Sequence, residues 1–172
     1  EVIILEKSGK LLSKVKVSGG GRCNVTHACY SIAEMIKKYT RGSSFLKKAF
    51  HHFFTNDTIA WFEERGVKLK TEADGRMFPV TNSSQTIIDC LMKEANKYAV
   101  DIRMNKEVKG IYTDAGKWSL IMKDDGIMPA DFICIASGGY PKLLQYDWLK
   151  KAEHTIEEPV PSLFTFNMPG NN

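Results

Sequence analysis

The chain opens in a short apolar run, residues 2–5, that no polar residue interrupts. Such a run is typical of a parallel strand that is covered on both faces. Parallel strands require crossover connections, which are usually helices. The run therefore favours an α/β fold. It is not preceded by an initiator Met, so we expect the chain to be a fragment of a longer protein or to begin at a domain boundary.

Composition excludes several classes of protein. The 172 residues are 43% hydrophobic and 26% charged, which is typical of a globular chain rather than a disordered one. The longest apolar run, residues 132–136, is far shorter than the ~20 residues of a membrane-spanning helix. The four cysteines have no framework spacing, which favours reduced thiols in a cytoplasm.

The small basic excess is weak evidence for a nucleic-acid partner. The net charge is +4, and acidic residues are scattered among the basic ones. A nucleic-acid domain usually gathers its cations on one face. We interpret the densest group as a solvated helix face and expect neither a nucleic-acid nor a membrane partner. That group is Lys37, Lys38, Arg41, Lys47 and Lys48.

Local signals predict the elements of the first part of the chain. Residues 55–65 carry Thr55 and Asp57 as helix-start signals and are followed by Gly66 as a stop. The other apolar patterns predict helices over 32–39 and 84–98. Residues 68–70 and 76–80 flank a turn at 73–75 and indicate either a small hairpin or a loop excursion.

The second part is expected to be richer in strands. Residues 101–104, 107–113 and 118–123 are separated by turn residues and predict a small antiparallel β-meander. Residues 131–136 predict a buried strand, and 143–149 a helix. We expect one domain over 1–160 and the start of a second, β-barrel-like domain over 161–172.

Glu6 is the first candidate site residue. In a dinucleotide-binding fold, a strand that ends in Asp or Glu presents a carboxylate to the adenosine ribose. Glu6 follows the opening apolar run and fits that position. The alternative is an ordinary surface strand that happens to end in Glu.

A glycine-rich loop and a small-residue turn are the other candidates. Gly19, Gly20 and Gly21 allow positive φ and a close approach of backbone N–H groups to an anion, and Arg22 adds a charge. The alternative is a flexible connector. Ser137, Gly138 and Gly139 follow the predicted strand 131–136, where open α/β sheets bind ligands. One long dinucleotide could bridge all three features.

Other eye-catching residues carry less weight. Cys23, His27 and Cys29 match no common zinc spacing, so we predict no metal site. His51 and His52 lie between phenylalanines and fit helix core or surface better than catalysis.

Several segments resemble the HI0933-like, or BaiN-like, family of bacterial NAD(P)/FAD-dependent oxidoreductases, some of which are described as aminoacetone oxidases. The resemblance extends over nearly the whole chain and rests on residues 14–26, 74–80, 136–142, 153–156 and 161–163. Two segments depart from the family pattern. The initial Gly-x-Gly-x-x-Gly is absent, and residues 143–148 replace a glycine-rich flavin contact.

The resemblance implies a Rossmann-like FAD-binding domain that lacks its first strand and helix. It implies that Glu6 holds the ribose and that Val108 lies by the adenine through backbone contacts. It places the flavin and pyrophosphate against Lys14, Ser18, Gly19, Gly20, Gly21, Arg22, Cys23 and Asn24, and the flavin beside Ser137, Gly138 and Gly139.

The implied activity is FAD-dependent oxidation or reduction of a small molecule, with NAD(P)H or oxygen as the second partner. We expect this chain alone to be inactive, to bind FAD weakly and to be able to form a homodimer. The alternative is a non-catalytic nucleotide-binding or interaction module.

Overall fold

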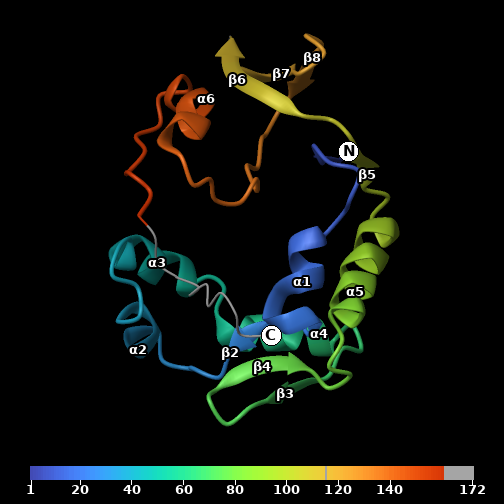
Figure 1. Ribbon diagram of the computed structural model, residues 1–172, viewed down its shortest axis with the longest axis vertical. Coiled ribbons are helices and arrows are strands. Elements are labelled where there is room, and N and C mark those ends of the chain that lie inside the picture. The colour runs from blue at the N-terminus through green and yellow to red at the C-terminus, as the bar shows by residue number, and fades with distance from the viewer. Residues whose placement is uncertain (115, 161–172) are drawn as a thin grey trace, which may run out of the picture. The chain divides into compact units, whose positions relative to one another are not determined.

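The computed structural model describes residues 1–114 and 116–160 (Figure 1). The predicted start of a second domain, 161–172, lies outside the described residues. The chain divides into two compact units, one of residues 1–4 and 10–102 and one that begins with residues 5–9 and continues from 103. None of the helices in the described part is long and apolar enough to cross a membrane.

The opening strand is parallel, as predicted, but it is not buried. β1 (Ile3–Leu5) pairs with β5 (Asp101–Arg103) in a two-stranded sheet. Asp101 N–H donates to Val2 O and Glu6 N–H donates to Arg103 O, so the paired numbers rise together and the strands are parallel. Val2 is 59% exposed and Ile4 43%. The expectation of burial was wrong because β5 is the only partner of β1 among the described strands.

Three helices form the framework of the first unit. α1 (Ser13–Gly21) lies beside α5 (Ser84–Lys97), as Figure 1 shows, and Ser84 Oγ donates to Lys16 O at 2.9 Å. α4 (Thr55–Glu63) begins where the Asp57 carboxylate accepts the Phe54 N–H at 2.7 Å. The predicted helices at 55–65 and 84–98 are thus confirmed, whereas α1 was not foreseen.

A small sheet completes this unit. β3 (Leu69–Thr71) and β4 (Arg76–Pro79) form the predicted hairpin, and β2 (Thr26–His27) adds to the other edge of β4 in antiparallel pairing. Phe78 of β4 is fully buried. The hydrophobic core of this unit contains four buried residues that come from different parts of the chain: Cys23, Val67, Ile87 and Cys90.

Two further helices connect β2 to α4. α2 (Ile32–Ile36) is shorter than the predicted helix over 32–39. α3 (Ser43–Phe50) packs against α2 and was not predicted.

The second unit contains the predicted antiparallel meander with a different set of strands. β6 (Val108–Asp114), β7 (Lys117–Met122) and β8 (Ile127–Ala130) pair in that order. Residues 101–104 were expected in this meander but supply β5, because β1 offers them a parallel partner.

The predicted buried strand at 131–136 is wrong. These residues form no strand, and Phe132 is 92% exposed. The segment is apolar, but no described strand pairs with it, and a strand without a ladder partner leaves its N–H and C=O groups unpaired. Beyond it, the predicted helix over 143–149 forms as two short pieces, η1 (Leu143–Tyr146) and α6 (Asp147–Lys150), of which α6 lies near β6.

Candidate functional site

Glu6 lies directly after β1, at the position the sequence predicts. Its backbone O accepts the Lys106 N–H at 2.9 Å, and its carboxylate Oε1 accepts the Ser8 N–H at 2.8 Å. Lys106 lies two residues before Val108, the first residue of β6. The structure therefore brings two of the predicted adenosine contacts, Glu6 and Val108, to the same end of the second unit.

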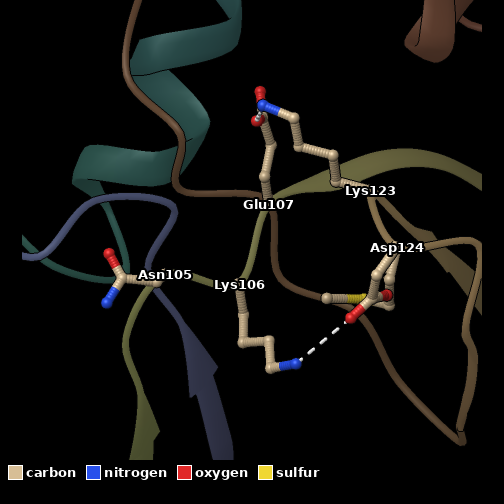
Figure 2. A pocket seen from close by; sticks show the side chains of 6 residues that line it. Asn105, Lys106, Glu107, Lys123 and Asp124 are labelled. Atoms are coloured by element: carbon tan, nitrogen blue, oxygen red, sulfur yellow. Dashed lines mark hydrogen bonds and ion pairs between the residues drawn. The ribbon is translucent and has the colours of Figure 1, made fainter.

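A pocket opens at this end, between the approach to β6 and the end of β7 (Figure 2). It encloses about 220 Å³ and is lined by Asn105, Lys106, Glu107, Met122, Lys123 and Asp124. Figure 2 shows Glu107 and Lys123 pointing toward one another, and their Oε2 and Nζ atoms are 2.8 Å apart. Lys106 Nζ lies 3.3 Å from Asp124 Oδ2. Two ion pairs thus border the pocket, and the sequence patterns did not indicate them.

The ion pairs set the protonation of the pocket. The Lys123 ammonium donates a hydrogen bond to Glu107 and, with its charge, holds the pKa of Glu107 below 4.5. The bond from Lys106 likewise lowers the pKa of Asp124 below 3.8, helped by the Gly126 N–H. Both carboxylates therefore remain ionised at neutral pH.

We expect Lys123→Ala to raise the pKa of Glu107 toward 4.5. A carboxyl whose pKa is lowered in the folded state adds stability above its unfolded pKa and loses that contribution as the pH falls through the folded value. The pair should therefore act fully at neutral pH and weaken only below about pH 4.5. A carboxyl ¹³C NMR titration measures the midpoint. Lys117→Ala, on an exposed residue at the start of β7, is the control, and an unchanged Glu107 midpoint in Lys123→Ala would contradict the assignment.

The size of the pocket can be compared with that of a ligand. About 220 Å³ is less than the ~300–1,000 Å³ typical of pockets for drug-sized molecules. The pocket is therefore suited to one ring system and not to a whole dinucleotide. Two predicted site residues adjoin its lining: the Glu6 backbone O accepts the Lys106 N–H, and Val108 directly follows Glu107.

The glycine-rich loop lies in the first unit and forms the end of α1. Ser18 is extended, with φ −62° and ψ 147°, and Gly19 and Gly20 are left-handed. The Cys23 N–H donates back to Ser18 O at 3.0 Å, and Ser18 Oγ donates to Val15 O at 2.9 Å. The loop is thus a defined turn with internal hydrogen bonds, not a loose connector.

Arg22 fastens this turn to the small sheet. Its guanidinium stacks 4.0 Å from the centre of the Phe78 ring and forms an ion pair with Glu72. With its amide oxygen and nitrogen exchanged, the orientation that satisfies both atoms, the Asn24 side chain donates to Thr26 O and Met77 O. Arg22 was predicted to face a phosphate or a ring carbonyl, and in this structure its charge is already paired. Sequence reasoning missed Glu72 and Phe78 as anchors.

The glycines of the loop differ in how tightly they are surrounded. A Cβ on Gly19 would lie 2.8 Å from both Asn24 N and Phe78 Cε1. A Cβ on Gly20 would meet nothing within 4 Å. Gly19 therefore serves packing, while Gly20 presents bare backbone to the surface.

The remaining predicted residues are also placed. Lys14 is exposed on α1, and Cys23 is buried in the core at 7% exposure. Ser137, Gly138 and Gly139 are exposed and outside any regular element. Glu6, Val108 and this turn belong to the second unit, and Lys14 and Ser18–Asn24 to the first. In the part of the chain that the structure describes, no three His, Cys, Asp or Glu side chains are grouped to hold a metal ion.

Comparisons with known proteins agree with this architecture. The family model of the HI0933-like protein Rossmann domain matches residues 1–160. The chain is 25% identical over 174 residues to the 3-dehydro-bile acid delta(4,6)-reductase of Clostridium scindens, which covers 95% of the chain and 40% of that protein. It is 27% identical to the ribosomal RNA dihydrouridine synthase of Escherichia coli over 80% of the chain and 33% of that protein.

The Haemophilus influenzae ribosomal RNA dihydrouridine synthase is 26% identical over 64% of the chain and 26% of its own length. The chain thus spans well under half the length of each of these relatives. The family model, by contrast, matches the chain almost from end to end. With its α/β architecture and its acidic residue at the end of a parallel strand, the chain belongs to the HI0933-like protein Rossmann domain family.

Proposed function

We propose that this chain holds FAD in an FAD-dependent oxidoreductase and that the pocket beside Glu6 receives the adenosine. Membership of the family supports a flavoprotein, and the name of the bile acid reductase relative supports reduction chemistry. The observation that carries the proposal is local. Glu6 follows a parallel strand, and its backbone O accepts the N–H of Lys106, a residue that lines the pocket at the start of β6.

Each predicted contact has a role in this proposal. Glu6 would accept hydrogen bonds from the ribose hydroxyls, and backbone groups of Val108 would contact the adenine. The exposed backbone of the glycine-rich loop, 18–24, and of the turn 137–139 would border the pyrophosphate and flavin. The bound flavin supplies the hydride or electron transfer, while the protein supplies orientation and electrostatics.

We expect Glu6→Ala to weaken FAD binding by about 1.5–3 kcal/mol, the range for hydrogen bonds to a charged group. Calorimetry on the full-length protein measures the effect. Glu6→Gln is the matched variant, because it keeps an acceptor for the Ser8 N–H and removes only the charge. FAD affinity that stays unchanged in both variants, with native circular dichroism, would show that Glu6 does not bind the cofactor.

The reaction class is tested on the same protein. The purified full-length protein should carry the visible absorption of a flavin, and heat release with chromatography should identify it as FAD. Anaerobic bleaching by NADH or NADPH would identify a nicotinamide as the reductant, and reoxidation by air would test oxygen as the acceptor. Candidate small-molecule substrates are then added to the reduced protein, and a substrate is recognised because it restores the absorption of the oxidised flavin.

The second candidate is a non-catalytic nucleotide-binding module. The size of the pocket favours it to the same degree, because one adenosine would fill the site without any flavin. In that case the full-length protein would be colourless and would bind ADP as tightly as FAD.

A further inference from the structure

A cationic surface on α2 and α3 has no role in the proposed cofactor site. No Asp or Glu occurs between Glu34 and Asp57, although this stretch carries five Lys or Arg residues and two His. We define the α3 basic surface by its exposed side chains there: Phe45, Lys47, Lys48, His51 and His52.

Helical spacing gathers these side chains on one side of α3. Phe45 and Lys48 lie three residues apart on one face of α3, and His51 and His52 directly follow its last residue, Phe50. Phe45 is 76% exposed, while Leu46 and Phe50 on the opposite side are half-buried. The Phe50 ring packs 6.0 Å from Tyr39 and 5.0 Å from Phe54, measured between ring centres. The packing of α3 therefore fixes which side faces outward.

The two lysines of this surface have no acidic partner in the described part of the chain. Lys37 pairs with Glu34 at 2.6 Å, one turn away on α2. Lys47 and Lys48 make no ion pair with any residue of the described ranges 1–114 and 116–160. An exposed aromatic ring thus lies beside uncompensated positive charge.

We propose that the α3 basic surface binds single-stranded nucleic acid. Lys47 and Lys48 would contact phosphates, and an unstacked base would pack on the ring of Phe45. Charged grooves with interspersed aromatic rings bind single strands in this way, because every base offers a flat face. The proposal is independent of the flavin site.

The sequence alone favoured a solvated helix face and no nucleic-acid partner. The structure adds the exposure of Phe45 and the lack of acidic partners for Lys47 and Lys48. A membrane surface fits less well, because an interfacial helix needs a continuous apolar face. On α3 the remaining large apolar side chains, Leu46 and Phe50, are turned toward the packed side.

The test is fluorescence anisotropy of the full-length protein with a labelled single-stranded RNA. A length of about 20 nucleotides exceeds the roughly 4–16 that one domain contacts. Lys47→Glu with Lys48→Glu should weaken binding and should flatten the dependence of log Kd on log salt by about 1.4, since each phosphate contact contributes about 0.7 for single strands. Phe45→Ala should weaken binding by about 5- to 160-fold, the loss of one stacked base.

The matched control carries the same charge change elsewhere on the first unit. Lys68→Glu with Lys93→Glu alters two exposed lysines outside the α3 basic surface. This control should weaken RNA binding much less than the α3 double variant does. Far-ultraviolet circular dichroism checks that each variant is folded. An unchanged flavin content shows that a loss of RNA binding does not come from damage to the cofactor site.

Three results would overturn the proposal. The first is an RNA affinity that is equal in wild type and in the α3 double variant. The second is an unchanged affinity in Phe45→Ala or equal binding of duplex RNA, which would leave only general attraction to polyanions. The third is binding to vesicles of anionic lipid without binding to RNA, which would make the partner a membrane.

Discussion

Gly19→Ala is expected to lower the free energy of unfolding by about 2–5 kcal/mol. Gly19 has a φ of +56°, and a left-handed conformation costs a residue with a Cβ about 1–2 kcal/mol. The added Cβ would also lie 2.8 Å from Asn24 N and from the fully buried Phe78 ring, and such overpacking costs about 1–3 kcal/mol more. Chemical denaturation followed by circular dichroism measures the change.

Gly20→Ala separates the two contributions. Its φ of +67° carries the same backbone cost, but its Cβ would meet nothing within 4 Å. We therefore expect a loss of about 1–2 kcal/mol from conformation alone. Equal losses in the two variants would mean that the close approach at Gly19 relaxes without cost.

Phe78→Ala is expected to destabilise the first unit by about 3–5 kcal/mol, the cost of emptying a buried aromatic site. Phe78 is fully buried in β4 and also carries the Arg22 guanidinium 4.0 Å from its ring centre. Removing the ring leaves a cavity. It should also loosen the glycine-rich turn, because Arg22 of that turn loses the ring on which it stacks. Denaturation gives the loss of stability, and proteolysis near residues 18–24 reports on the turn.

Phe132→Ala is the matched control, because the same atoms are deleted from a side chain that is 92% exposed. We expect a change within about 0.5 kcal/mol. A large loss in this variant would show that Phe132 is covered in the full-length protein.

The elements that the sequence predicted correctly have their signals within a few residues. Asp57 at the start of α4 and Gly66 after its end mark that helix locally, and the 73–75 turn does the same for the β3–β4 hairpin. Pairing between strands that are far apart in the sequence has no such local signal. Residues 101–103 were assigned to the meander because alternating side chains indicate a strand but do not indicate which other strand it pairs with.

The candidate site was predictable to a similar degree. The position of Glu6 follows from the apolar run before it, and the resemblance placed Val108 beside the same adenosine. The ion pairs at the pocket and the hold of Glu72 on Arg22 depend on residues brought together by folding. The segment 74–80, which the resemblance singled out, contains Phe78 and was a usable signal for the stacking of Arg22 on that ring, but Glu72 lies outside it.

The parallel pairing of β1 with β5 also determines an order of assembly. The β3–β4 hairpin joins neighbouring strands, so it can close early, before the ribosome has made residues 101–103. β1 must wait until residues 101–103 have been made, and closing so long a loop carries a larger entropic cost. Its apolar side chains, and Glu6 with them, should therefore reach their final positions only after the β3–β4 hairpin has formed.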